Sequence, residues 1–220
     1  MNNNVLRMGV SSKHYTNAYL EFLSKLGWES EHTNSRNYYR QLLNSAFDID
    51  LFLMNTHDIP LCIDKGYLDI GVLQKSVIEE ERVTVTESLE LPFGIGEMVI
   101  AVPKNSCIKE LKDLNHKIIA TRNPNITKRF FSEKGMDVEI FKVSKGTEVF
   151  PHLSEDISGM VEYRKTGETI RANNLVEIQS IMKSSLLIVE KKATPLCIEF
   201  CNQARTYIEN NNIPNEWIYV

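Results

Sequence analysis

Short, continuous apolar runs alternate with segments of helical periodicity along this chain, and that alternation limits the folds open to it. Val5–Val10, Ile49–Met54 and Leu68–Leu73 are predicted as buried strands. Between the first two, Thr16–Leu26 places apolar residues at helical spacing and ends at Gly27. Further strands are predicted at Val83–Leu91, Met98–Val102, Lys117–Thr121, Val138–Val143, Ile157–Tyr163, Leu175–Ile181 and Leu186–Val189, and further helices at 58–66, Asn125–Gly135, Thr147–Leu153, Thr166–Asn174 and Thr194–Asn212. Continuous apolar strands separated by helices are typical of an α/β fold whose parallel sheet is covered on both faces.

The strand–helix pattern restarts near Pro103–Lys117, which predicts two α/β lobes. We expect lobe I to comprise residues 1–102 plus 190–220, and lobe II to comprise residues 103–189, so that the last helix returns to the first lobe. A length of 220 residues suits two small lobes. Such an arrangement also predicts a cleft between the lobes, where ligands are usually bound.

The composition excludes several classes of function. The chain carries 25 Lys+Arg against 29 Asp+Glu, a net charge of −4, so it lacks the basic surplus that nucleic-acid binding usually needs. No apolar run approaches the ~18–20 residues of a membrane span, and the first residues lack the pattern of a signal peptide. We therefore expect a cytoplasmic protein, with reduced thiols at positions 62, 107, 197 and 201 and no metal site among them.

The segment from Ser158 to Thr169 carries the strongest chemical signal. An apolar strand ends at an acidic residue, Glu162, and a turn containing Thr166 and Gly167 opens the next helix. Backbone N–H groups at a helix start can bind phosphate, and hydroxyls of Thr166 and Thr169 would add donors. Glu162 could accept hydrogen bonds from two sugar hydroxyls, so the segment suits a ribose 5-phosphate; ordinary helix capping is the structural alternative.

A second segment, Ala120–Arg129, also joins a strand to a helix with a basic first turn. It contains Thr121 and Arg122 beside a polar turn, which suits contact with an anionic group. A capped helix with solvated Lys and Arg side chains explains the same residues without any ligand.

The order of motifs resembles that of the ATP phosphoribosyltransferase family. The matching motifs are Leu6–Met8, Phe52–Leu53, Asp58–Pro60, Gly66–Gly71, Leu91–Gly94, Val99–Pro103, Ile119–Thr121, Pro124–Thr127, Glu133–Met136, Glu148–Val149, Lys165–Thr169, Arg171–Asn173 and Leu175–Glu177. They cover roughly residues 5–192, and the length is similar to that of the short form of the family, which lacks a C-terminal regulatory domain. The resemblance implies a two-lobed fold of the periplasmic-binding-protein type (type II).

That resemblance also implies an activity. Members transfer the phosphoribosyl group of phosphoribosyl pyrophosphate (PRPP) to N1 of ATP, the first step of histidine biosynthesis, and pyrophosphate leaves. It implies Mg²⁺ to neutralise pyrophosphate, a histidyl-tRNA-synthetase-like regulatory subunit as partner, and a homo-oligomer, expected to be a dimer. The displacement is direct and needs no protein nucleophile.

The same resemblance implies which residues form the site. PRPP contacts carry over to Glu162, Lys165, Thr166, Gly167, Glu168 and Thr169. Contacts to the acceptor or leaving group are expected from Lys13, His14, Asp58, Asp69, Thr121 and Arg122, although capping explains Asp58 and a strand-end turn explains Asp69 equally well. No residue is predicted as a metal ligand.

Several expected cations are missing from the first half. Ser12 and His14 stand where the family has Lys and Arg, Asn55 replaces part of a basic pair, and Glu97 replaces a basic residue. Each lost charge-assisted hydrogen bond to phosphate is worth about 1.5–3 kcal/mol, so these departures predict weak contacts with ATP. Two alternatives stay open beside ATP transfer: a diverged enzyme using another heterocyclic acceptor, or a non-catalytic ligand-binding or regulatory homologue.

Overall fold

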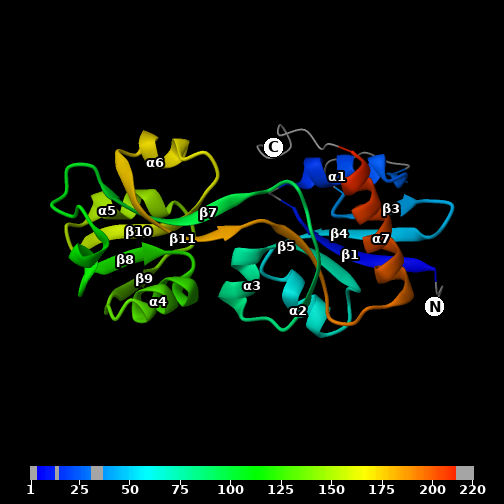
Figure 1. Ribbon diagram of the computed structural model, residues 1–220, viewed down its shortest axis with the longest axis horizontal. Helices are drawn as coiled ribbons and strands as arrows, with labels where there is room; N and C mark the ends of the chain where they lie inside the picture. The colour runs from blue at the N-terminus through cyan, green and yellow to red at the C-terminus, as the bar shows by residue number, and fades with distance from the viewer. Residues whose placement is uncertain (1–3, 13–14, 31–36, 212–220) are drawn as a thin grey trace. The chain divides into compact units, whose positions relative to one another are not determined.

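The computed structural model describes residues 4–12, 15–30 and 37–211, and the chain forms two compact units (Figure 1). Unit 1 comprises Met1–Gly94 and Ser185–Val220, and unit 2 comprises Ile95–Ser184. Each unit has its own sheet and its own apolar core. The expected α/β class is therefore confirmed in both units.

Unit 1 is built on a seven-stranded sheet of order β2-β3-β4-β1-β5-β12-β6. Its strands are β1 (Val5–Ser11), β2 (Glu29–Ser30), β3 (Tyr39–Leu43), β4 (Asp48–Met54), β5 (Ile70–Gln74), β6 (Thr86–Glu90) and β12 (Leu186–Glu190). Strand β1 lies parallel to β4 and β5, whereas β3 and β12 run antiparallel to their neighbours. The sheet is therefore mixed, and the prediction of a parallel sheet was wrong for its edges.

Four helices cover the sheet of unit 1: α1 (Thr16–Lys25), α2 (Ile59–Asp64), α3 (Lys75–Glu81) and α7 (Pro195–Asn210). Helices α1 and α7 share one apolar cluster with alternate residues of β1, and α2 and α3 share another with Leu187 and Val189 of β12. Because side chains alternate along a strand, the two clusters lie on opposite faces of the sheet. Trp28 belongs to the first cluster, and the centroid of its ring lies 5.1 Å from that of Phe47 and 5.4 Å from that of Phe200.

Unit 2 is built on a five-stranded sheet of order β11-β7-β10-β8-β9. Its elements are β7 (Gly96–Pro103), the 3₁₀ helix η1 (Leu111–Leu114), β8 (Ile118–Thr121), α4 (Pro124–Glu133), β9 (Glu139–Lys142), the 3₁₀ helix η2 (Thr147–Val149), α5 (Phe150–Leu153), β10 (Ile157–Arg164), α6 (Glu168–Ala172) and β11 (Leu175–Ser184). Strand β8 is parallel to β9 and β10, and β7 is antiparallel to β10 and β11. This sheet is mixed as well.

The chain changes units at different positions from those expected at 102 and 190. It leaves unit 1 after Gly94 and returns at Ser185. Strand β7 belongs to unit 2 because it pairs with β10 and β11, and β12 belongs to unit 1 because it pairs with β5 and β6. Apolar runs identify both strands in the sequence, but they contain no information about which strand each one pairs with.

No helix among the described residues is long and apolar enough to cross a membrane. Within the same part of the chain, no group of three or more His, Cys, Asp or Glu side chains is arranged to hold a metal ion. The four cysteines are free thiols, of which Cys197 and Cys201 lie on α7 and are buried in the apolar cluster that α7 shares with α1.

Candidate functional site

The loop from Lys165 to Thr169 connects β10 to α6 in unit 2. Gly167 has a φ of 78°, the left-handed region that favours glycine. A Cβ at Gly167 would lie 3.0 Å from Arg171 Nη1 and 3.1 Å from Glu177 Oε1. The side chains of Thr166, Glu168 and Thr169 are exposed, whereas Gly167 is buried. The loop therefore keeps its polar groups accessible around a backbone turn that a side chain would disturb.

Two contacts hold this turn from within. The backbone N–H of Glu168 donates to Thr166 Oγ1 at 3.4 Å, and Arg171 Nη2 donates to the Thr166 carbonyl at 3.2 Å. Helix α6 ends at Ala172 rather than Asn174 and has five residues, so its dipole is small. The groups that this loop presents to solvent are therefore the hydroxyls of Thr166 and Thr169, on either side of the bend at Gly167.

Lys165 precedes the turn and is half-buried. Burial lowers the pKa of its ammonium group, because a charged amine loses hydration inside the protein.

Glu162 lies near the end of β10, and only 6% of the residue is exposed. Arg122 donates from Nε to Oε2 at 2.9 Å and from Nη2 to Oε1 at 2.7 Å. Thr147 Oγ1 donates to Oε2 at 2.6 Å, and the N–H of Tyr163 donates to Oε1 at 2.9 Å. A carboxylate offers about four acceptor positions, and donors of unit 2 occupy all of them. A ribose hydroxyl, the expected ligand of Glu162, could therefore bind this carboxylate only by displacing one of these donors.

Arg122 follows β8, and its side chain is 44% exposed. The hydrogen bonds to Glu162 raise the pKa of its guanidinium, and the more distant charge of Glu148 adds to the rise. The preceding residue, Thr121, is fully buried, and its Oγ1 accepts hydrogen bonds from Asn123 N at 2.9 Å and from Thr127 Oγ1 at 3.2 Å. Thr121 thus holds the turn that carries Arg122, and its hydroxyl is already used there.

The expected contacts in unit 1 have mixed outcomes. Asp69 accepts hydrogen bonds from Arg7 through the backbone N at 2.8 Å, Nε at 3.0 Å and Nη2 at 2.7 Å. These bonds raise the pKa of the Arg7 guanidinium and tie the start of β5 to β1. Asp58 occupies the N-cap position of α2 but makes no capping hydrogen bond through its side chain, and it is exposed. Lys13 and His14 lie outside the described residues.

Glu97 and Asn55, two of the positions where the resemblance implies a basic residue, each contact a neighbouring residue in the structure. Glu97 on β7 forms an ion pair with Arg164 at 3.1 Å, and Arg164 also pairs with Glu177 on β11 at 3.3 Å. Asn55 Oδ1 accepts a hydrogen bond from the N–H of His57 at 3.1 Å and so closes a turn after β4. The negative charge at position 97 is therefore balanced inside unit 2.

Sequence reasoning missed Thr147, Arg164 and Arg7, which organise these carboxylates. Arg7 and Arg164 lie within or beside quoted motifs, and charged residues on apolar strands were the available signal. No sequence signal pointed to Thr147, because its partner Glu162 is 15 residues away in the sequence.

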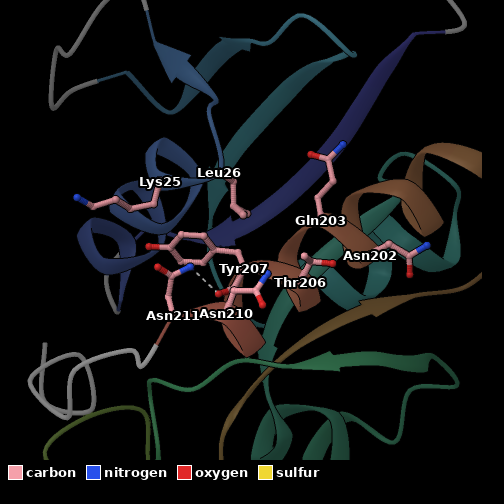
Figure 2. A pocket seen from close by; sticks show the side chains of 8 residues that line it. All are labelled: Lys25, Leu26, Asn202, Gln203, Thr206, Tyr207, Asn210 and Asn211. Atoms are coloured by element: carbon pink, nitrogen blue, oxygen red, sulfur yellow. Dashed lines mark hydrogen bonds between the residues drawn. The ribbon is translucent and has the colours of Figure 1, made fainter.

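An open groove of 510 Å³ lies between the end of α1 and the last turns of α7 in unit 1. Figure 2 shows its lining side chains, which include Lys25, Gln203 and Tyr207. Of the predicted site residues that the structure describes, none lines this groove.

Comparison with known proteins places the chain among relatives of one kind. The family model for ATP phosphoribosyltransferase matches residues 55–210. The ATP phosphoribosyltransferase of Pyrococcus furiosus is 34% identical over 163 residues, which cover 74% of this chain and 78% of that protein. The Staphylococcus aureus enzyme is 26% identical over 189 residues, with 86% and 89% covered. The Methanopyrus kandleri enzyme is 32% identical over 142 residues, which span 64% of this chain but only 50% of that protein.

Solved structures agree on the fold. The ATP phosphoribosyltransferase (HisG:HisZ) complex from Thermotoga maritima matches with a TM-score of 0.76 at 24% identity, covering 94% of this chain and 100% of that chain. A probable amino-acid transporter extracellular-binding protein from Bacillus subtilis matches with a TM-score of 0.63 at 11% identity, covering 97% of each chain. These likenesses confirm the two-lobed, periplasmic-binding-protein-like fold. Since the family model spans most of the chain and the Pyrococcus relative is matched over more than two thirds of its length, the chain belongs to the ATP phosphoribosyltransferase family.

Proposed function

We propose that this protein transfers the phosphoribosyl group of PRPP to N1 of ATP, as the first step of histidine biosynthesis. The ring nitrogen attacks C1 of the ribose, the bond from C1 to the pyrophosphate oxygen breaks, and pyrophosphate leaves with the electron pair. The match of residues 55–210 to the family carries this proposal. A cytoplasmic location and a homodimeric state go with it.

Within unit 2, the loop from Lys165 to Thr169 is the proposed site for the 5′-phosphate. Support comes from the left-handed Gly167, where an added Cβ would lie close to Arg171 and Glu177, and from the exposed hydroxyls of Thr166 and Thr169. The partly exposed guanidinium of Arg122 is the proposed contact for the pyrophosphate. The ring nitrogen of ATP is the nucleophile and none is needed from the protein, so the residues act by orientation and by stabilising the charge of the leaving group.

The residues also suit Mg²⁺ that arrives with the substrate. The described residues contain no cluster of acids that could hold a metal by themselves, and Mg²⁺ commonly binds through substrate phosphates with few protein ligands. Bound there, it would neutralise the charge of pyrophosphate.

A regulatory subunit is proposed as partner, because the Thermotoga protein was solved as a complex of two different proteins named HisG and HisZ. The histidyl-tRNA-synthetase-like character of that subunit is what the short form of the family implies. Among the described residues of unit 1, the proposed acceptor contact with an exposed side chain is Asp58.

The experiment measures pyrophosphate release from PRPP and Mg²⁺ with ATP as acceptor, with and without the regulatory subunit. Formation of phosphoribosyl-ATP supports the proposal. A second candidate, transfer to another heterocycle, is favoured by Asn55 and Glu97 at positions where the family is basic. Release with a different heterocycle but not with ATP would establish that candidate, and PRPP binding without release with any acceptor would indicate a binding homologue.

A further inference from the structure

We propose that Glu162 is a positioning residue that holds the guanidinium of Arg122 against the pyrophosphate of the ligand, and that it does not bind the ribose hydroxyls. This inference rests on the proposed function for the class of ligand. It changes the expected role of Glu162 from binding ribose to holding Arg122, and it gives Thr147 the role of holding the Glu162 carboxylate. Glu162, Arg122, Thr147 and Tyr163, which make this set of hydrogen bonds, all lie in unit 2.

The first argument is saturation of the carboxylate. Each oxygen of Glu162 accepts two hydrogen bonds, one from Arg122 and one from either Thr147 or the N–H of Tyr163. A hydroxyl that displaced the guanidinium would replace two charge-assisted bonds and leave a buried carboxylate without its counter-ion, which is unfavourable. The other two donors are also difficult to displace, because Thr147 is fully buried and Tyr163 donates through its backbone N–H.

The second argument is the uneven exposure of the pair. The side chain of Glu162 is 8% exposed and that of Arg122 is 44% exposed. Arginine has five N–H groups, and two of them bond Glu162. The other three have no acceptor among the described residues. An arginine fixed through one edge and open at the other suits bidentate recognition of a phosphoryl group.

The surroundings of Arg122 leave its charge available. Its bidentate partner is Glu162, and Glu148 contributes a smaller electrostatic effect on the pKa of Arg122. Thr121 fixes the backbone on the side of β8 by accepting hydrogen bonds from Asn123 and Thr127. Thr147 fixes the carboxylate from η2. Arg122 is therefore fixed before any ligand binds, both in its backbone and at its guanidinium group.

The test measures binding of inorganic pyrophosphate, which has no ribose, to the full chain by calorimetry with Mg²⁺. We expect Arg122→Gln and Glu162→Gln each to weaken pyrophosphate binding by about tenfold or more, because Arg122→Gln removes the guanidinium and Glu162→Gln removes the carboxylate that holds it in place. The double variant should bind no worse than Arg122→Gln, since the two residues act as one unit. Asp137→Asn, which alters an exposed residue of unit 2, is the control and should bind as the wild type does.

A second measurement compares the affinities of the protein for ribose 5-phosphate and for 2-deoxyribose 5-phosphate, which lacks the 2-hydroxyl. If Glu162 only positions Arg122, Glu162→Gln leaves the ratio of these two affinities unchanged. Unchanged pyrophosphate binding in Glu162→Gln would overturn the inference, as would loss of discrimination between the two sugars.

Because Glu162 is buried, urea unfolding must show that Glu162→Gln is folded, and Thr147 provides an independent test. Thr147→Val should weaken pyrophosphate binding, and Thr147→Ser, which keeps the hydroxyl, should restore it. The inference would be contradicted if the two variants weakened pyrophosphate binding equally, or if neither variant weakened it. A wild type that binds PRPP but not pyrophosphate overturns this inference alone, whereas one that binds neither overturns the proposed function as well.

Discussion

The carboxylate of Asp69 accepts three hydrogen bonds from Arg7, one from the backbone N–H and two from the Nε and Nη2 edge of the guanidinium. Sequence reasoning had left a turn and a ligand contact as equal alternatives for Asp69. The geometry favours the structural role, because this bidentate pair connects β1 with the start of β5. Asp58, by contrast, is exposed and makes no capping bond through its side chain. Two acids from matched motifs thus differ in how much of their charge remains for a ligand.

Asp69→Asn should lower the free energy of unfolding by about 1 kcal/mol, a modest value because the Arg7 side chain is 43% exposed. Urea unfolding measures this, and PRPP binding should stay unchanged. Asp58→Asn is the matched control and should leave stability as it is. If Asp69→Asn keeps full stability but weakens ATP binding, Asp69 contacts the nucleotide.

Cys201 gives the stability of the protein a dependence on alkaline pH. Burial, helped by the charge of Glu190, raises the pKa of the Cys201 thiol from 9.0 to about 11. Between these values the folded state keeps a proton that the unfolded state has lost. The free energy of unfolding therefore falls as the pH rises through this range, by up to about 1.4 kcal/mol per pH unit. Cys201→Ala should show a shallower fall in urea unfolding at pH 9–11, and an identical slope would contradict the assignment.

At the scale of elements, β7 lies between β10 and β11, and this pairing determines which side chains face Glu97. Glu97 lies opposite Arg164 in the register of β7 and β10, and opposite Lys183 in that of β7 and β11. Its ion pair with Arg164 is partly buried, with both side chains 27% exposed. A basic residue at this position would face two cations. The departure from the family therefore has a structural partner within the same sheet.

Glu97→Lys, which introduces the basic residue that the family resemblance implies at this position, should destabilise the protein by about 1–3 kcal/mol, because it removes one of the two acidic partners of Arg164 and adds a like charge. Glu97→Gln should cost less, since it removes the ion pair without repulsion. Both are measured by urea unfolding together with phosphoribosyl-ATP formation. A stable Glu97→Lys variant with faster turnover would show that this position acts on the nucleotide instead.

The elements that the sequence predicted share a strong local signal. The apolar runs of β1, β4 and β10 and the capped α7 were found within a few residues of their bounds. Strand β3 and helix α3 were missed. Strand β3 (YRQLL) has no alternation of polar and apolar residues, and α3 has seven residues, too few for a helical period to be recognised. Tertiary pairing, rather than local propensity, forms these short elements.

At the scale of the whole molecule, the sequence predicted two α/β units and a family, but not the state of the charges in the site. The motif from Lys165 to Thr169 was recognisable because a backbone bend requires glycine at position 167. The pairing of Glu162 with Arg122 and Thr147 was not, because it joins residues 40 and 15 positions apart. Long-range pairing of this kind also determines that β7 and β12 belong to units other than those expected.

Calorimetry with PRPP and Mg²⁺ on the full chain tests the central claim, that unit 2 binds the phosphoribosyl donor around Gly167. Gly167→Val places a branched side chain at a φ of 78°, against Arg171 and Glu177. Gly135→Val is the matched control, because Gly135 has a φ of 68° and nothing within 4 Å of an added Cβ. We predict that the wild type and Gly135→Val bind PRPP, and that Gly167→Val binds at least about tenfold more weakly, a difference of about 1.4 kcal/mol or more. Absence of binding by the wild type, or equal binding by a folded Gly167→Val variant, would contradict the claim.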